Sequence, residues 1–321
     1  MNKVLVILGP TATGKTDLAL QLARQFAGEL VSVDSRQVYA GLDIGTGKIS
    51  NFKFQISNFS KHKNYWEVDG VKIWMYDVAD PNKQYTVYDY VKDADRVIGD
   101  IKERGKLPIV VGGTGLYLKA LLEGLPNLAI PVDKKLRKQL NKLTVDQLQE
   151  KLKNLSFERW QKMNDSDRQN SRRLVRAIEL SLDHIDPRSR LPRHFVSCND
   201  VLRIGLTAPR DILYERVDER VVSRINQGMI EEAKRLHESG LTYARMKQLG
   251  LEYGVLADYL SGAIREIEGD WGLIKIVQNK IHGFVRRQLT WFNKEKNVVW
   301  FDIISKNYPK KLENLVTRWY H

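Results

Sequence analysis

The feature that most restricts the fold of this chain is a short segment near its start, Gly9–Thr16 (GPTATGKT), together with the run before it. That run, Lys3–Leu8 (KVLVIL), is apolar after its first residue and has the length of a strand buried in a parallel sheet. The segment matches G-x-x-x-x-G-K-[ST], the P-loop pattern, which connects a strand to a helix and binds phosphate groups. The sequence therefore predicts a strand, a phosphate-binding loop and a helix, in this order.

The residue types of the P-loop suit a phosphate chain. Glycines let backbone N–H groups approach phosphate oxygens, and the start of the helix adds partial positive charge. Lys15 supplies a cation, and the hydroxyl of Thr16 is a candidate ligand for Mg²⁺. The predicted diphosphate-binding or nucleotide-binding residues are Gly9, Pro10, Thr11, Ala12, Thr13, Gly14, Lys15 and Thr16. The motif alone does not say whether the phosphate chain belongs to ATP.

Strand-like and helix-like segments alternate along much of the chain, which predicts a parallel α/β sheet. Further strands are expected at Leu30–Val33, Lys106–Val111, Val201–Leu206 and Asn297–Ile303, and helical segments at Thr16–Phe26, Val87–Ile101, Arg210–Ser239 and Asp270–Phe292. The predicted fold class is a P-loop NTPase-like parallel sheet flanked by helices. Asn51–Asn64 is polar and interrupts the alternation, so we interpret it as a surface excursion or a hairpin.

The composition changes after Pro126. Asp133–Asp183 lacks glycine and consists mainly of good helix formers, which predicts a helical subdomain inserted into the core. The expected boundaries are 1–125 and 200–321 for the core and 126–199 for the insert. Pro131–Phe195 contains 16 Lys and Arg against 9 Asp and Glu, while the whole chain has a net charge of +13. This local excess fits a surface that binds the phosphate backbone of nucleic acid, and a solvated helical face is the alternative.

Polar motifs follow the second and third predicted strands. Ser32–Tyr39 (SVDSRQVY) contains Asp34, and the Gly-Gly turn after Val111 is followed by Thr114. Ligands of open parallel sheets bind beyond the carboxyl ends of the strands, so both residues are expected near the P-loop. Asp34 is then a candidate to accept a proton or bind an amine, and a capping aspartate is the alternative. Gly45–Lys48 (GTGK) could bring a second cation.

Two further motifs combine basic and helix-forming residues. Arg172, Arg173 and Arg176 lie at the spacing of neighbours on one helix. Arg286–Phe292 (RRQLTWF) combines basic and aromatic residues, a pattern that can bind nucleic acid by charge and stacking. A solvated face and a buried core are the respective alternatives.

Taken together, the motifs resemble those of the bacterial tRNA dimethylallyltransferases. The resemblance rests on GPTATGKT, SVDSRQVY, DIGTGK, VGGTGLYLKALLEG, RRLVRAIE and RRQLTWF, which occur in the family's order from residue 9 to residue 292. It implies transfer of a dimethylallyl group from dimethylallyl diphosphate to the exocyclic amine of the adenosine 3′-adjacent to the anticodon. The target adenine would have to be flipped out of its stack.

The resemblance also implies roles for individual residues. The P-loop, through Thr11–Thr16, would hold the diphosphate leaving group together with Mg²⁺. Asp34 resembles the general base, and Thr114 resembles a second catalytic residue. Residues that resemble tRNA contacts, or that we expect from their charge to contact the tRNA anticodon stem-loop, are Asp34, Ser35, Arg36, Gln37, Arg137, Arg172, Arg173, Arg176, Arg286 and Arg287.

The chain departs from the family pattern in three places. The excursion at Asn51–Asn64 is longer than usual, and Ile73–Asp77 stands where a histidine-containing stretch is common. His282 stands where arginine is expected, which puts a diphosphate or backbone contact in question. The single cysteine, Cys198, excludes an internal disulfide and a C2H2 zinc finger, and we expect it to be a bystander.

Three other functions share parts of this pattern. A small-molecule P-loop kinase shares the loop, an adenylate isopentenyltransferase shares donor and chemistry, and an RNA-binding protein could retain an inactive P-loop. The first two leave the basic insert unexplained, and the intact Lys15 and Asp34 argue against the third. No apolar stretch is long enough for a membrane helix, and Val4–Leu8 is too short for a signal-peptide core. We therefore expect a cytoplasmic protein without membrane contact, and the resemblance implies a monomer.

Overall fold

The computed structural model describes residues 3–48, 58–125, 127–128, 130–182, 200–264 and 269–321. The chain divides into two compact units, of which the larger comprises Met1–Leu121 and Val196–His321 and the smaller comprises Leu122–Phe195. Each unit is described by itself. In the described part of the chain, no helix is both long and apolar enough to cross a membrane.

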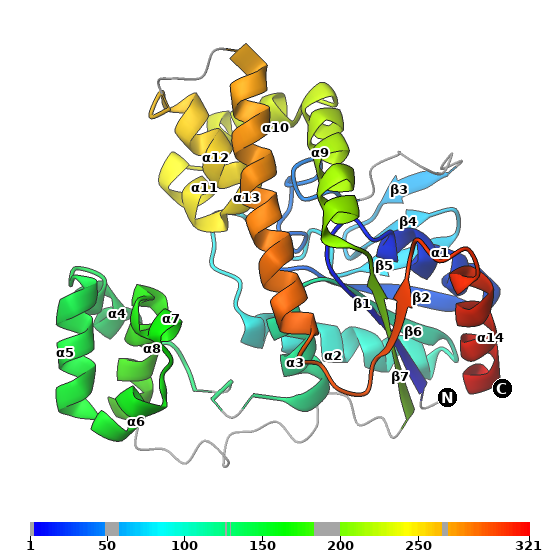
Figure 1. The fold of residues 1–321 in the computed structure, drawn as a ribbon, viewed down its shortest axis with the longest axis horizontal. Coiled ribbons are helices and arrows are strands. Elements are labelled where there is room, and N and C mark those ends of the chain that lie inside the picture. Colours follow the sequence, from blue (N-terminus) through cyan, green and yellow to red (C-terminus); the bar gives the residue numbers. More distant parts are fainter. Residues whose placement is uncertain (1–2, 49–57, 126, 129, 183–199, 265–268) are drawn as a thin grey trace. The chain divides into compact units, whose positions relative to one another are not determined.

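The larger unit is built on an eight-stranded sheet in the order β3-β4-β5-β2-β6-β1-β7-β8 (Figure 1). Its strands are β1 (Lys3–Leu8), β2 (Gly28–Val33), β3 (Phe59–Lys61), β4 (Tyr65–Val68), β5 (Val71–Trp74), β6 (Leu107–Gly112), β7 (Asp200–Thr207) and β8 (Val299–Asp302). Neighbours from β5 to β8 pair in parallel, whereas β4 pairs antiparallel with both β3 and β5. The predicted parallel α/β architecture is confirmed, and β3 and β4 add an antiparallel edge to it.

Helices cover both faces of this sheet. The first, α1 (Lys15–Gln25), connects β1 to β2, and α2 (Val87–Glu103) connects β5 to β6. The two connections run in opposite directions across the sheet, so right-handed crossovers place α1 and α2 on opposite faces. The strands between them are buried: every residue of β2 and every residue of β1 after Lys3 is in the core. Two further helices, α3 (Gly115–Glu123) and α14 (Tyr308–Tyr320), follow β6 and β8.

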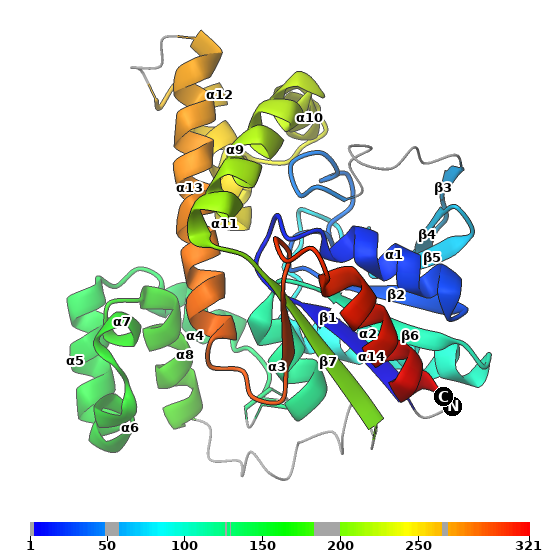
Figure 2. The same ribbon diagram turned by 45° about the vertical axis from the view of Figure 1, so that its right-hand side comes forward.

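A group of helices follows β7 and lies beyond one end of the sheet (Figures 1 and 2). It consists of α9 (Arg210–Asn226), α10 (Met229–Glu238), α11 (Tyr243–Leu249), α12 (Leu251–Leu260) and α13 (Gly269–Phe292). The prediction of a single helical segment at Arg210–Ser239 is wrong, because the helix ends after Asn226 and a second helix begins at Met229. Gly228 has a φ of 94° in the left-handed region, which ends one helix and starts the next.

The predicted strand positions agree with the structure to within one or two residues at each end. The excursion predicted at Asn51–Asn64 lies partly outside the described residues; its described part contains β3, which forms a hairpin with β4. Trp66 of β4 and Ile73 of β5 are buried although their segments were not predicted as strands. Cys198 lies outside the described residues.

The smaller unit is helical. Its helices are α4 (Lys134–Leu140), α5 (Val145–Leu155), α6 (Phe157–Lys162), α7 (Asp165–Arg168) and α8 (Ser171–Leu182). Their apolar core contains Leu140, Leu148, Leu152, Leu174 and Ile178. Thr144 closes a capping box at the start of α5, as expected for a hydroxyl residue three positions before a glutamine. The unit therefore has a core and helix boundaries of its own.

Candidate active site

The P-loop joins β1 to α1 as predicted. Gly9 has a φ of +139°, and a Cβ atom there would lie 2.2 Å from the carbonyl oxygen of Leu206 on β7. Only glycine fits this position, because both the backbone conformation and the neighbouring strand exclude a side chain. Gly14, with a φ of 80°, is the residue before α1. The loop therefore turns back over the start of the helix, where backbone N–H groups can bind an anion.

Lys15 is buried within the loop that it belongs to. Its Nζ donates to the carbonyl oxygen of Pro10 at 2.5 Å and lies 3.4 Å from Thr13 Oγ1. Burial lowers the pKa of Lys15 to about 7; the nearby Arg220 acts in the same direction, and Asp34 acts against both. A negative charge bound beside Lys15 would offset the cost of its buried charge.

Three arginines of α9 share the cavity with the P-loop. Arg220 Nη1 lies 3.5 Å from Thr11 Oγ1, and Arg216 Nη1 lies 3.4 Å from the carbonyl oxygen of Ala12. Burial first, and the neighbouring Arg224 second, lower the pKa of Arg220 to about 9. These arginines were not predicted as site residues. Their four-residue spacing places them on one face of a helix and could have indicated them.

Asp34 and Thr114 lie at adjacent strand ends, as predicted, but in different surroundings. Asp34 lines the cavity, and its Oδ1 accepts from the backbone N–H of Arg36 at 2.8 Å and of Gln37 at 3.3 Å. Thr114 Oγ1 accepts from the backbone N–H of Ser35 at 3.2 Å, and its side chain is not among those that line the cavity. Thr114 therefore contacts the loop of Asp34 and can act on the site through it.

Gln288 of α13 connects the P-loop with the loop after β6. Its Oε1 accepts from Thr11 N–H at 2.9 Å, and its Nε2 donates to Gly113 O at 2.9 Å. A Cβ atom on Gly115 would lie 2.1 Å from the indole nitrogen of Trp291, and Phe292 is 2% exposed. The aromatic residues of this motif are therefore packed against the core, and its basic residues, Arg286 and Arg287, are the exposed ones.

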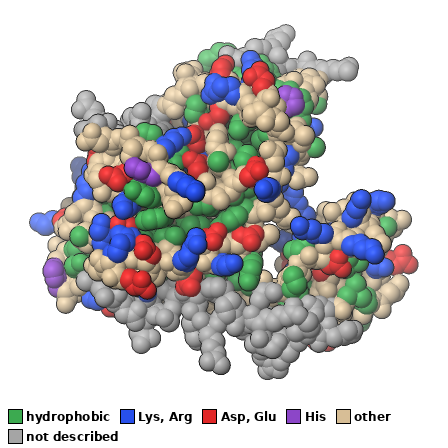
Figure 3. Space-filling view, turned by 180° about the vertical axis from the view of Figure 1, so that it is seen from behind, with side chains coloured by type: hydrophobic (Ala, Val, Ile, Leu, Met, Phe, Trp, Pro, Cys, Tyr) green, Lys and Arg blue, Asp and Glu red, His purple; other side chains and the backbone are tan. Residues whose placement is uncertain are grey.

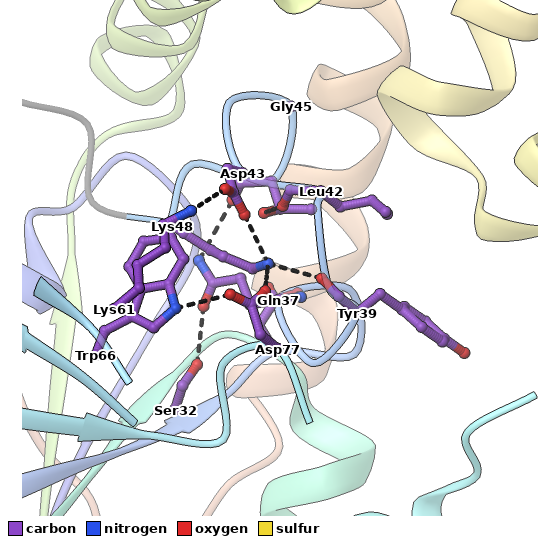
Figure 4. Close-up of polar contacts among 12 residues, drawn as sticks. Ser32, Gln37, Tyr39, Leu42, Asp43, Gly45, Lys48, Lys61, Trp66 and Asp77 are labelled. Carbon is purple, nitrogen blue, oxygen red and sulfur yellow. Dashed lines mark hydrogen bonds and ion pairs between the residues drawn. The ribbon is translucent and has the colours of Figure 1, made fainter. Parts of the chain in front are cut away.

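Lys48 does not bring the second cation that its motif suggested. Its side chain is fully buried, and its Nζ donates to Tyr39 O at 2.7 Å and to Asp43 at 3.0 Å, and also binds Asp77 (Figure 4). Trp66 Nε1 donates to the other oxygen of Asp77 at 2.7 Å. Lys48 therefore connects the loop to the hairpin instead of facing the cavity.

These elements enclose a cavity of about 330 Å³. One part of its wall is cationic and polar, with Lys15, Thr16, Arg216, Arg220 and Asp34. Another part is apolar and includes Leu20, Val68, Tyr76, Val217, Ile281 and Phe284. The cavity therefore offers an anion site next to an apolar surface and a carboxylate, which suits a small molecule with a phosphate end and a hydrocarbon end.

Comparison with known proteins matches this geometry. Residues 37–295 match the family model described as IPP transferase, and residues 2–60 match the one described as isopentenyl transferase. The chain belongs to the IPP transferase family.

Named relatives of this IPP transferase are similar over nearly the whole chain. The tRNA dimethylallyltransferase of Halalkalibacterium halodurans is 34% identical, and the match covers 97% of this chain and 94% of that protein. The tRNA dimethylallyltransferase of Lactococcus lactis subsp. lactis is 36% identical, and the match covers 99% of this chain and 98% of that protein. The crystal structure of the full-length tRNA isopentenylpyrophosphate transferase from Bacillus halodurans is 32% identical, has a TM-score of 0.68 and covers 100% of this chain and 97% of that one.

Some of the residues predicted to contact tRNA form hydrogen bonds or ion pairs within this IPP transferase, and others are exposed. In the smaller unit, Glu179 is buried and accepts from Arg137 Nε and Nη2 at 2.6 Å each and from Arg176 Nη1 at 3.1 Å. Arg173 pairs with Asp167, and Arg172 is exposed. Figure 3 shows Lys and Arg side chains gathered on the surface of this unit.

In the larger unit, the predicted contacts after β2 are also held internally. Arg36 Nη1 donates to Glu252 at 2.9 Å, and its guanidinium lies 5.2 Å from the ring of Phe284. Ser35 donates its N–H to Thr114, as described above. Asp34, Arg36 and Gln37 all line the cavity, whereas Ser35 does not.

Proposed function

We propose that this IPP transferase moves a dimethylallyl group from dimethylallyl diphosphate to the exocyclic amine of the adenosine 3′-adjacent to the anticodon in tRNA, with release of diphosphate. The observation that carries the proposal is that the P-loop and Asp34 line one cavity, whose wall also includes an apolar surface. A kinase would need the anion site, but this combination also suits an apolar donor and an acceptor that must lose a proton.

The diphosphate end of the donor is assigned to the P-loop from Gly9 to Thr16. Backbone N–H groups of the loop, Lys15 and Arg220 stabilise the charge that develops on the leaving group. Lys15 is buried and Arg220 is partly buried, and both carry lowered pKa values, so an anion bound beside them relieves an unfavourable concentration of positive charge.

The acceptor amine is assigned to Asp34. Two backbone N–H groups donate to Oδ1 of Asp34, and these two hydrogen bonds fix the orientation of its carboxylate. As the amine bonds to the allylic carbon, the carbon–oxygen bond to diphosphate breaks, and Asp34 takes the proton that the amine loses. Thr114 supports this role by holding Ser35 N–H.

Magnesium is assigned to Thr16 and to oxygens of the bound diphosphate. Among the described residues, no group of three His, Cys, Asp or Glu is placed to hold a metal ion, and Thr16 lines the cavity. This donor set fits Mg²⁺, which retains several waters and binds substrate phosphates with few protein ligands. When bound, the ion would neutralise charge on the leaving group.

The anticodon stem-loop of tRNA is assigned to the basic residues. Arg172, Arg173, Arg286 and Arg287 are exposed and are proposed to contact its backbone directly. Arg137 and Arg176 are proposed to act by holding Glu179 and the segment before α4, since Arg176 Nη2 also donates to Asn127 O and Ile130 O. We further propose that the enzyme acts as a monomer in the cytoplasm.

The test is to incubate the protein with dimethylallyl diphosphate, Mg²⁺ and unmodified tRNA and to analyse the digested nucleosides by mass. We expect isopentenyladenosine from tRNA and none from AMP offered alone. Product from AMP would favour an adenylate isopentenyltransferase, and ATP consumption with a small acceptor would favour a kinase. Absence of isopentenyladenosine with a competent tRNA pool would refute the proposal.

A further inference from the structure

The loop that carries the DIGTGK motif is held by a carboxylate from a distant helix. Glu232 of α10 is 5% exposed, and its Oε2 accepts from the backbone N–H of Asp43 at 3.0 Å and of Ile44 at 2.8 Å. Its Oε1 accepts from the N–H of Gly45 at 3.1 Å and from the hydroxyl of Tyr253 at 2.5 Å. Three successive backbone donors and one hydroxyl therefore satisfy this buried charge.

On its other side, the same loop determines how the side chain of Gln37 is oriented in the cavity. Gln37 Nε2 lies 3.3 Å from Thr46 O and 3.4 Å from Gly47 O, and its Oε1 accepts from Ser32 Oγ at 2.8 Å (Figure 4). Backbone carbonyls only accept hydrogen bonds, so they fix the amide nitrogen on their side. Gln37 therefore presents its oxygen, an acceptor, on the side of Ser32.

The loop could not take this path without its two glycines. A Cβ atom on Gly45 would lie 2.7 Å from the Tyr253 ring, and one on Gly47 would lie 2.0 Å from Arg224, which itself donates to Gly45 O at 3.0 Å. The loop is thus pressed between the helices that follow β7 and the cavity. Glu232 and Arg224 both bond its backbone from the helix side, and of these two side chains only that of Glu232 lies outside the cavity lining.

We infer that Glu232 is a positioning residue for the acceptor: through the loop of Asp43–Gly47, it fixes the amide of Gln37 so that the amide oxygen is offered to an N–H donor of the incoming base. The inference rests on the proposed function for the identity of that base, an adenine with an exocyclic amine. Gln37 is the group that meets the substrate, and Glu232 acts only through the loop.

The direct variant is Glu232→Gln, which preserves size and removes one acceptor. Each oxygen of Glu232 accepts two hydrogen bonds, so either orientation of the new amide places an NH₂ group against at least one backbone N–H. We expect the KM for tRNA to rise about tenfold, while the KM for dimethylallyl diphosphate stays within about twofold. Glu231→Gln, one residue earlier and exposed, removes the same charge and is the matched control.

A merely structural role gives a different result. Loss of folded protein lowers the apparent kcat and leaves both KM values unchanged, so that outcome would overturn the inference. Tyr253→Phe is a milder second variant, because it removes one hydrogen bond and no charge, and we expect a smaller rise in the KM for tRNA alone. An unchanged KM for tRNA in both variants would also overturn it.

Amide hydrogen exchange separates this inference from the proposed function. We expect the peptide containing Asp43–Gly45 to be protected in the native protein and to exchange faster in Glu232→Gln, but not in Glu231→Gln. If the native protein modifies no tRNA and this difference in exchange is still seen, the proposed function fails and the anchoring of the loop stands. Equal exchange in all three proteins would refute the anchoring itself.

Discussion

Gln288 and Thr11 are 277 positions apart in the sequence and are joined by a hydrogen bond of 2.9 Å from the backbone N–H of Thr11 to the side-chain oxygen of Gln288. The same amide donates to Gly113 O, so one side chain of α13 holds both the P-loop and the loop after β6. The shape of the anion site therefore depends on a residue outside the P-loop motif.

Replacing Gln288 by Ala should weaken donor binding. The change leaves Thr11 N–H and Gly113 O without this partner and should cost about 1–3 kcal/mol of stability. Because Thr11 is in the P-loop, the KM for dimethylallyl diphosphate should also rise about tenfold. Gln278→Ala is the control: Gln278 is on the same helix and 8% exposed, but it does not line the cavity. Equal donor KM values in the two variants would contradict the prediction.

Donor binding should take up a proton above neutral pH. The pKa of Lys15 is lowered to about 7, mainly by burial, so above that pH the free protein holds it neutral, whereas a bound diphosphate favours the charged form. Affinity should therefore fall as pH rises from about 7 to about 9. Calorimetry in buffers of different ionisation enthalpy measures the number of protons taken up when the donor binds. Lys15→Met should abolish the proton uptake by the protein. Equal uptake by both proteins would show that the proton goes to the ligand.

The lowered pKa of Lys15 also makes the stability of the protein depend on pH. An unfolded lysine retains a pKa near 10.5, so between about pH 7 and pH 10 the unfolded chain binds more protons at this position than the folded chain does. The contribution of Lys15 to the free energy of unfolding should therefore rise with pH in this window. Urea unfolding at a series of pH values should show a shallower rise, or a steeper fall, for Lys15→Met than for the native protein.

Two arginines of the smaller unit should behave in opposite ways when replaced by Ala. Arg137→Ala removes two 2.6 Å hydrogen bonds from the buried Glu179, which retains its bond to Arg176, and should destabilise the protein by about 1.5–3 kcal/mol. Arg172→Ala removes an exposed cation, so it should leave the melting temperature unchanged while weakening tRNA binding and reducing its salt dependence. Filter binding at several salt concentrations, with a melting curve for each variant, decides between the two effects.

His282, which stands where arginine was expected, faces away from the anion site. Its Nε2 lies 2.8 Å from Asp218 Oδ1, and its ring stacks on Tyr214 at 4.0 Å. None of the three lines the cavity. His282→Arg should therefore change the KM for dimethylallyl diphosphate by less than about twofold. A large decrease in that KM would mean that the side chain at this position reaches the diphosphate.

Local sequence patterns were sufficient where one segment determines its own structure. The P-loop, the strands around it and the position of Asp34 beside it follow from an apolar run, a glycine spacing and the rule that ligands bind at strand ends. The family follows from the order of the motifs. None of these conclusions requires knowledge of which helix faces which.

Features that depend on tertiary packing could not be predicted from local sequence patterns. Arg220 reaches the cavity only because of the way α9 packs beside the P-loop, and the spacing of its arginines fits a solvated face equally well. The motif of Lys48 suggests a cation of the site, but Asp43 of the same motif and Asp77 from a distant segment bind this side chain in the interior. Arg176 resembled a tRNA contact, and its bonds to Glu179 and to backbone carbonyls could not be inferred from its neighbours in sequence.

The central claim, that Asp34 and the P-loop serve one transfer reaction, is tested most directly by counting both products with Asp34→Asn as the comparison. The variant retains an oxygen that can accept from Arg36 N–H and Gln37 N–H, so the loop should remain in place while the base is lost. In the native protein we predict one diphosphate released for each isopentenyladenosine formed in tRNA. Asp34→Asn should bind tRNA normally and lose at least about a hundredfold of both products. Full activity of Asp34→Asn, or diphosphate release without modified adenosine in the native protein, would contradict the claim.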